Sequence, residues 1–81
     1  MRYFFHTADG SRDRDMEGTE LPDHRAARIE ATKFAGACMN DHPNELWETG
    51  DFRIEVTDER DTLLFTITSI AVAAPMTGEV R

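Results

Sequence analysis

The stretch DFRIEVTDERDTLLFTITSI, residues 51–70, decides the fold. Apolar residues occupy every second position of its first half, at Phe52, Ile54 and Val56. The same spacing returns after a turn at residues 58–61, at Leu63, Phe65 and Ile67. A period of two is typical of a half-buried antiparallel strand. The two halves therefore predict a β-hairpin with one apolar face, which another element has to cover.

A helix from about Asp23 to Asn40 is the expected cover. Apolar residues recur there at helical spacing, at Ala27, Ala31, Phe34, Ala35 and Cys38. Pro22 favours an extended residue before it, and the Asp23 carboxylate can accept a hydrogen bond from the first free amides of a helix. Because alanine is small, the helix axis can approach a sheet closely.

The amino-terminal part predicts two more strands. Residues 2–8 carry bulky groups on both faces, with Tyr3 and Phe5 on one side and Phe4 and His6 on the other. Asp9-Gly10-Ser11 is typical of a turn, and a second strand is expected at about residues 12–17. Residues 41–50 read as a loop or short helix, in which Trp47 is expected to close one end of the core.

These elements predict one α+β domain over residues 1–74. It is an antiparallel sheet of about four strands with one helix packed on one face, in the order β-β-α-β-β. Residues 75–81, after Pro75, are expected to form a flexible carboxy-terminal tail. A chain of 81 residues has room for a single domain with a thin core.

The charge balance argues against nucleic-acid and membrane partners. The net charge is −7, from 9 basic and 16 acidic residues. Phosphate binding draws its affinity from clustered Lys and Arg. Arg12 and Arg14 are interleaved with Asp9, Asp13 and Asp15, so they form no uninterrupted basic patch. The same shortage of cations disfavours an anionic membrane surface.

The single cysteine, Cys38, cannot form an internal disulfide. A reducing cytoplasm is therefore the expected compartment. The opening residues 1–6 are apolar over too short a stretch for a signal-peptide core or a membrane span. We expect no targeting segment.

Several motifs resemble a family of very small bacterial proteins known only as a domain of unknown function. They are MRYFFH at 1–6, Asp9-Gly10, DMEGTELPD at 15–23, the helix containing Glu30-Ala31, and IEVTDE at 54–59. The resemblance extends from Met1 to about Ile67. It implies kinship, and it brings no activity and no catalytic residue. The turn at Asp58–Asp61 departs from the family pattern by lacking a glycine.

A looser similarity of pattern exists to the antitoxin halves of bacterial toxin–antitoxin pairs. Those domains open with short strands, an Asp or Pro-Asp corner, and a helix that begins near a Glu-Ala pair. Such a similarity carries no site. It leaves open an antitoxin-like regulator that binds a basic partner protein.

Two patterns resemble metal sites, and neither is complete. Asp13 to Gly18 resembles the start of a calcium loop, but the twelfth position is His24 instead of a bidentate glutamate. Cys38 and His42 stand four residues apart near a helix end, whereas a zinc site needs three or four protein ligands. We expect no bound metal and no cofactor.

Catalysis is not expected either. A nucleophile such as Ser11, Ser69 or Cys38 would need a histidine and an orienting acid beside it, and no motif places them together. A domain this thin has little room for a pocket of the ~300 to 1,000 Å³ that is typical of small-molecule sites. The sequence therefore predicts a protein that is not an enzyme.

The uncharged run Ile70 to Ala74 has no obvious place in the core. The alternation of the preceding strand breaks near Ser69, which predicts a bulge, a strand end or a change of partner. The run is then either an edge extension buried in the monomer or an exposed strand that pairs with another chain. We expect a non-catalytic protein–protein interaction module, with a homodimer as one version of it, whose candidate partner-binding residues are Phe4, His6, Ile67, Ile70 and Val72.

Overall fold

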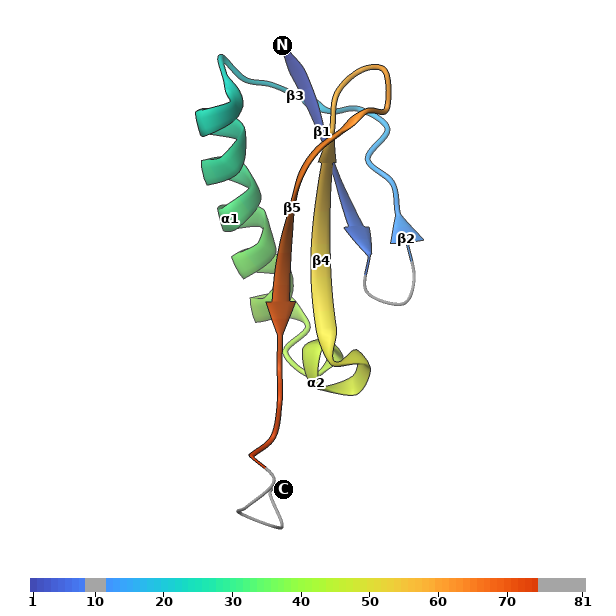
Figure 1. Cartoon of the computed structure of the whole chain (residues 1–81), viewed down its shortest axis with the longest axis vertical. Helices are drawn as coiled ribbons and strands as arrows, with labels where there is room; N and C mark the ends of the chain where they lie inside the picture. Colours follow the sequence, from blue (N-terminus) through green and yellow to red (C-terminus); the bar gives the residue numbers. More distant parts are fainter. Residues whose placement is uncertain (9–11, 75–81) are drawn as a thin grey trace.

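The computed structural model describes residues 1–8 and 12–74 (Figure 1). The strands are β1 (Arg2–Ala8), β2 (Arg12–Asp13), β3 (Thr19–Glu20), β4 (Asp51–Thr57) and β5 (Leu63–Ile70). The helices are α1 (His24–Asp41) and α2 (Glu45–Thr49). The α+β class and the order of the main elements are confirmed, with β3 and α2 as short additions. The expected turn at 9–11 and the expected tail at 75–81 lie outside the described residues.

The sheet is antiparallel in the order β2-β1-β4-β5, and β3 also pairs with β1. The Phe5 amide donates to the Asp15 carboxylate, and Leu21 donates to the Met1 carbonyl. Backbone polar groups alternate in direction along a strand, so the odd-numbered residues of β1 direct theirs away from β4. The segments β2 and β3 therefore share one edge of β1, as the two ends of an interrupted edge strand. This arrangement replaces the continuous second strand expected at 12–17.

Helix α1 begins where the sequence predicts. The Asp23 carboxylate accepts a hydrogen bond from the Ala26 amide at 2.8 Å, which satisfies one of the free amino-terminal donors. Ala27, Ala31 and Ala35 are its buried residues. Their spacing puts them on one stripe, and their methyl groups allow the helix to lie close to the sheet.

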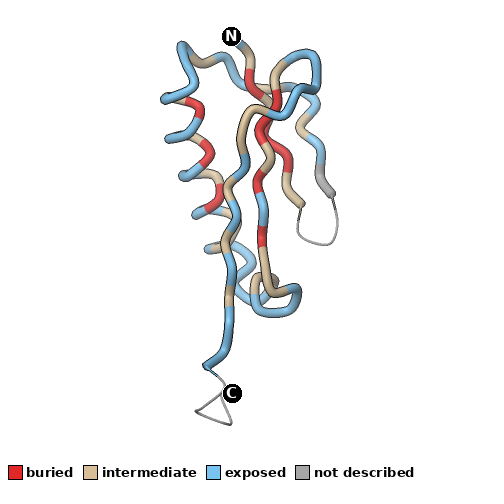
Figure 2. Tube along the Cα trace, in the orientation of Figure 1, coloured by how far each residue is buried: buried red, intermediate tan, exposed pale blue. Residues whose placement is uncertain are grey.

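The core lies between this alanine stripe and one face of the central strands (Figure 2). The largest contributions come from Tyr3, Phe5, Phe52, Ile54 and Val56. They face the helix together because the register pairs Phe5 with Val56 and Ile54 with Ile67. The period-two expectation for residues 52–56 is confirmed.

The hairpin departs from the expectation at its closed end. Val56 pairs with Phe65 and Thr57 pairs with Leu63, so Leu64 is an extra residue in a bulge. The bulge turns Leu63 outward, where 56% of its surface is exposed, and lets Leu64 pack against the core. Ser69 pairs with Phe52 and the strand ends at the next residue, Ile70, so of the three outcomes expected near Ser69 the structure has a strand end.

Trp47 does not close the core. It lies on the short helix α2 and is 63% exposed. Leu46, its neighbour, packs against the core instead. A helix of only five residues presents one of two adjacent side chains inward, and here that side chain is leucine. Within residues 1–8 and 12–74, neither helix combines the length and apolar character that a bilayer crossing requires.

Candidate functional site

The candidate partner-binding residues occupy different environments. Ile70 and Val72 are 70% and 77% exposed. Ile67 is half-buried on the helix side of β5, and Phe4 is half-buried on the opposite face of the sheet. His6 is 1% exposed and has no surface for a partner. Ile67 and Ile70 therefore share β5 but lie on opposite faces of it, and Val72 follows two residues after its end.

Strand β5 forms one edge of the sheet. The described part of the chain pairs it with β4 alone. The backbone amides and carbonyls of the odd-numbered β1 residues point away from β4. By the same alternation, Val56–Phe65 and Ile54–Ile67 are the residue pairs that exchange hydrogen bonds between β4 and β5. The Ala71 amide, which donates to the Gly50 carbonyl at 3.1 Å, continues the same parity. Thr66, Thr68 and Ile70 consequently direct their amides and carbonyls to the outer edge.

The opposite edge of the sheet is closed by the segment between β2 and β3. One Asp15 carboxylate oxygen accepts from the Glu17 and Gly18 amides, each at 3.0 Å, and the other accepts from Phe5 at 3.2 Å. The Asp15 amide donates to Nδ1 of His6, whose Nε2 lies 2.9 Å from the Thr57 hydroxyl. Nδ1 is therefore an acceptor, and the proton of the neutral ring is on Nε2.

Burial by itself raises the pKa of the Asp15 carboxyl. The hydrogen bonds from Gly18, Glu17 and Phe5 outweigh that effect and lower its pKa below the ordinary value of 3.8. The ionised carboxylate accepts the Phe5 amide hydrogen bond that a neighbouring strand would otherwise accept. It holds residues 14–18 beside β1, so the edge of β1 at Phe5 is covered.

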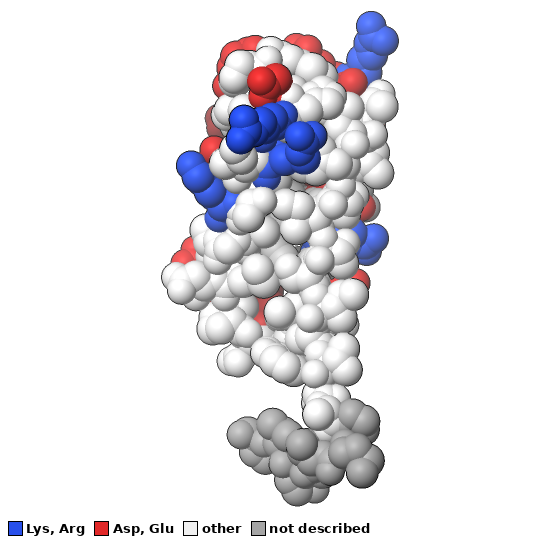
Figure 3. Space-filling view, turned by 60° about the vertical axis from the view of Figure 1, so that its left-hand side comes forward, with Lys and Arg blue, Asp and Glu red and all other residues white. Residues whose placement is uncertain are grey.

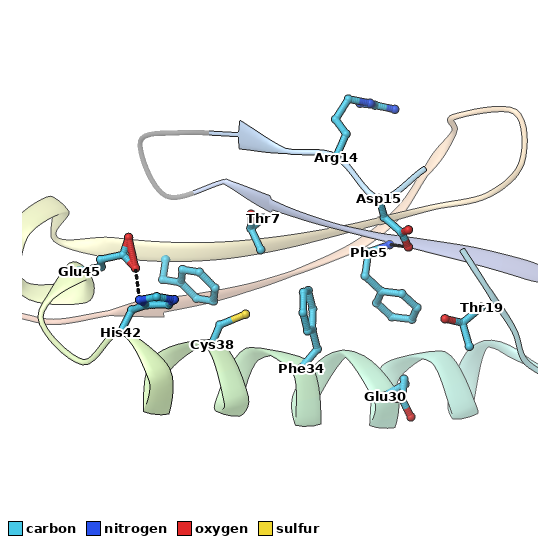
Figure 4. Close-up of a pocket in the computed structure, with 11 residues that line it drawn as sticks. Phe5, Thr7, Arg14, Asp15, Thr19, Glu30, Phe34, Cys38, His42 and Glu45 are labelled. Atoms are coloured by element: carbon cyan, nitrogen blue, oxygen red, sulfur yellow. Dashed lines mark hydrogen bonds and ion pairs between the residues drawn. The ribbon is translucent and has the colours of Figure 1, made fainter. Parts of the chain in front are cut away.

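A groove of about 740 Å³ runs between α1 and β1 (Figure 4). Its helix wall carries Glu30, Phe34, Cys38 and His42, which follow one another at intervals of four residues. They form one stripe beside the buried alanines. The groove is partly open to solvent, so it agrees with the expectation that so thin a domain can hardly enclose a pocket of this size. Helix α1 packs mainly over β4 and β5, and it reaches β1 through the ring contact between Phe34 and Phe5.

The strand wall of the groove comes from β1 and the segment after β2. Phe5 and Thr7 belong to β1, and Arg14, Asp15 and Thr19 lie at one end. Phe52 of β4 and Glu45 of α2 complete the lining. Figure 4 shows the Phe5 and Phe34 rings pointing toward each other from the two walls, and their centroids are 6.4 Å apart in an edge-to-face arrangement. The lining mixes apolar and polar groups, with the Asp15 carboxylate toward one end and the Glu45 carboxylate toward the other (Figure 4).

The sequence reading missed the groove residues Glu30, Thr19 and Glu45. For Glu30 a signal existed, since it continues the Phe34 and Cys38 stripe one turn earlier. For Thr19 and Glu45 no such signal exists. Their positions depend on how two loops return to the ends of α1.

The metal patterns are not assembled into a site. No three His, Cys, Asp or Glu side chains come together in a way that could hold an ion, as far as residues 1–8 and 12–74 are concerned. His42 instead lies 3.7 Å from the Glu45 carboxylate (Figure 4). The residues that resemble the start of a calcium loop form the turn at Asp15, where the carboxylate accepts hydrogen bonds from backbone amides.

All three histidines contact groups other than the candidate nucleophiles. His24 forms a 2.7 Å hydrogen bond with the Tyr3 hydroxyl, His6 contacts Thr57 and Asp15, and His42 contacts Glu45. Ser69 is paired in the sheet with Phe52, and Ser11 lies outside the described residues.

Comparison with known proteins gives kinship alone. Residues 2–71 match the family described as Domain of unknown function (DUF6894). This confirms the resemblance to a small family of unknown function. No curated protein and no solved structure matches the chain.

Proposed function

The chain belongs to the DUF6894 family, and from the structure of this member we propose that it is a non-catalytic interaction module that pairs with a second copy of itself along β5. The observation that carries the proposal is the outer edge of β5. It is eight residues long, and its outward-facing amides and carbonyls at Thr66, Thr68 and Ile70 have no strand beside them in the described chain.

Natural edge strands are usually protected by lysine, proline, a central bulge or a covering segment. Residues 62–74 contain no charged residue and no proline. The single bulge lies at Leu64, at the end of the strand, and leaves residues 65–70 regular. Such an edge is a template for another strand.

The surface on this side favours a second copy as the partner. Figure 3 shows the side of α1 and β5 as a largely white face, below basic side chains near the start of the helix. The chain carries a net charge of −7, so two copies repel each other unless they meet through an uncharged surface. An antitoxin-like role with a basic partner would call for carboxylates here, and β5 has none.

The register follows from the alternation. Residues 63–71 lie beside β4 and Gly50, interrupted only by the bulge at Leu64, and Ile67 is at the middle of this stretch. Antiparallel pairing about a two-fold axis at Ile67 brings Thr66 opposite Thr68 of the second copy. It brings Ile67 opposite Ile67 as a pair that exchanges no hydrogen bonds, with Cα atoms about 4.5 Å apart.

Light scattering after size-exclusion chromatography tests the proposal. The wild-type chain should have twice the 9.2 kDa monomer mass. Thr68→Pro removes an outward amide without removing a hydrogen bond to β4, and proline is tolerated on an open edge. This variant should be monomeric, whereas Thr68→Val, which keeps the amide, should remain dimeric. A monomeric wild type at about 1 mM, or a dimeric and folded Thr68→Pro variant, would contradict the pairing.

Oxidative cross-linking tests the register. In a Cys38→Ala background, Ile67→Cys places two thiols opposite each other at a Cα separation that suits a disulfide. Ser69→Cys is the matched control, because this register places it opposite Phe65. We expect a covalent dimer from the first variant only. The reverse result would show that the strands pair in another register.

A further inference from the structure

We propose that two copies joined along β5 also contact each other through α1, with Arg28, Thr32 and Met39 on the contacting flank of the helix. The inference rests on the proposed pairing of β5 and adds a second surface to it. It follows from where α1 lies over the sheet, and from which side of the helix faces the β5 edge.

The strand pairing puts both helices on one face of the joined sheet. Residues that lie directly opposite each other on antiparallel strands have their side chains on the same face. In the proposed register Ile67 lies opposite Ile67 of the second copy, and in each copy Ile67 packs against the core beneath α1. The two-fold axis is therefore perpendicular to the sheet, and the two α1 helices run in opposite directions on the same side of it.

The position of α1 brings the two helices within packing distance. Helix α1 packs mainly over β4 and β5, so its axis lies near the line between these strands, half a strand spacing from β5. A further half spacing separates β5 from the two-fold axis. With strands about 4.8 Å apart, the two helix axes are then about 10 Å apart, close to the distance of about 8–10 Å between packed helices.

The flank of α1 that faces the β5 edge can be identified from the groove. Glu30 and Phe34 belong to the helix wall of the groove, on the β1 side of the buried alanines. At 3.6 residues per turn, the residues on the other side of the alanines are Arg28, Thr32 and Met39. Arg28 and Thr32 are exposed, and Met39 is half-buried against the core.

The region where the helices would cross carries a short side chain. Figure 1 shows α1 running alongside β5, so the middle of the helix, at Thr32, lies near the middle of the strand, at Ile67. A sheet twist of about 20–25° per strand gives two helices that cross at about 40–50°, close to a common class of helix packing. The Thr32 hydroxyl already donates to the Arg28 carbonyl at 2.9 Å, so covering it leaves no polar hydrogen unpaired.

The contact would also cover apolar surface that a single copy leaves partly open. Phe65, Ile67 and Met39 are all half-buried and pack against the core. Pairing of β5 places the Phe65 and Ile67 side chains of the two copies side by side under the two helices. A helix pair above them would remove this apolar surface from water, which favours association.

A bulky cation at the crossing tests the helix contact. Thr32→Arg should raise the dimer dissociation constant about tenfold or more, because it brings two long like-charged side chains together beside Arg28. A general charge effect would act the other way, since an added cation reduces the repulsion between two chains of net charge −7. Ala37→Arg is the matched control, because Ala37 is also exposed but faces away from β5. It should change the constant by less than about twofold.

Sedimentation equilibrium measures these constants, and circular dichroism verifies that each variant is folded. Cross-linking gives a second measurement that does not depend on affinity. In a Cys38→Ala background, Thr32→Cys should form a covalent dimer with a short bismaleimide, whereas Ala37→Cys should not.

The outcomes separate this inference from the pairing of β5. The helix contact is overturned if Thr32→Arg dimerises as the wild type does, if Ala37→Arg weakens the dimer equally, or if Thr32→Cys gives no cross-link. In each of these cases the pairing of β5 still stands, provided that Ile67→Cys forms its disulfide. A wild-type chain that stays monomeric, with no disulfide from Ile67→Cys, overturns both proposals.

Discussion

Asp15 shows how one side chain can replace part of a strand. The edge of β1 is paired by β2 at one end and by β3 at the other, and between them the carboxylate accepts the Phe5 amide. Two further amides, of Glu17 and Gly18, bind its second oxygen. The segment thereby reaches across the edge without a regular strand conformation.

The lowered pKa of Asp15 gives a prediction with a definite sign. The carboxyl has a lower pKa in the folded chain than in the unfolded one, so its ionisation stabilises the fold at pH values above about 4. This stabilisation is lost as the pH falls through the folded-state pKa. Urea unfolding at pH 7 and pH 3 should show a larger loss of stability for the wild type than for Asp15→Asn.

The substitution has a cost of its own at neutral pH. An asparagine side chain has one acceptor oxygen, so it cannot serve Phe5 and the Glu17–Gly18 turn together. Leaving one amide unsatisfied should lower the free energy of unfolding by about 1–3 kcal/mol at pH 7. Glu20→Gln is the necessary comparison, because the amino-terminal ammonium group lowers the pKa of the Glu20 carboxyl as well. Identical pH profiles for wild type and Asp15→Asn would contradict the assignment.

Two glycines give opposite predictions for the same substitution. Gly18 has a φ of +74°, and an added Cβ would lie 2.8 Å from Phe4 and Arg2 side-chain atoms. Gly36 is exposed within α1, and an added Cβ would meet nothing within 4 Å. Gly18→Ala should destabilise the fold by about 2 kcal/mol, through backbone strain and crowding. Gly36→Ala should stabilise it by about 0.5–1 kcal/mol.

Urea denaturation of both variants, read by circular dichroism, measures the difference. A Gly18→Ala variant as stable as the wild type would show that the turn next to Phe4 adapts freely. A neutral Gly36→Ala variant would contradict the view that its position is an ordinary exposed helix site.

At the scale of the elements, the spacing between α1 and the sheet is set by alanine. Ala31 has no exposed surface and is in the middle of the buried stripe. Ala31→Leu would add three carbon atoms between helix and sheet, and overpacking of this kind costs about 1–3 kcal/mol. Ala37→Leu, on the exposed side of the same helix, should change stability by less than about 0.5 kcal/mol. Thermal unfolding of the two variants distinguishes a packed interface from a loose one, in which both would be tolerated.

The elements also show what a sequence pattern can predict. The core strand and the helix were predictable because Phe52, Ile54 and Val56 alternate, and because Asp23 has a capping side chain at the right place. The bulge at Leu64 was not predictable. Both Leu63 and Leu64 are apolar, so either could face inward, and the turn conformation decides between them. Asp61 has a φ of +64° in that turn, a conformation that the letters DERD do not specify.

The candidate sites were predictable to different extents. The uncharged run after Phe65 pointed to the β5 edge, because the absence of charge is itself a local signal. The groove depends on where α1 sits across the sheet, which is a tertiary property. The position of a helix over a sheet is not encoded in any short segment. Glu30, Phe34, Cys38 and His42 could therefore be recognised as one wall of a groove only once α1 was placed beside β1.

At the scale of the whole molecule, size links stability to self-association. A domain of 81 residues buries a smaller fraction of its surface than a larger one, and the core here is one layer of side chains between α1 and the sheet. Pairing through β5 would add hydrogen bonds at Thr66, Thr68 and Ile70. It would also cover Ile67, which α1 leaves half-buried. The folded dimer, and not the monomer, would then be the stable unit.

This coupling predicts that the melting temperature depends on protein concentration. Unfolding of a dimer to two chains is opposed by mass action, so a tenfold higher concentration should raise the melting temperature by about 3 to 5 °C for an assembly of this size. Calorimetry of the wild type at about 10 and 100 µM measures the shift. Thr68→Pro should melt at a lower temperature that is independent of concentration, because it has no partner to lose. A wild type whose melting temperature is the same at both concentrations would contradict the coupling and would place the whole stability of the domain in the single layer beneath α1.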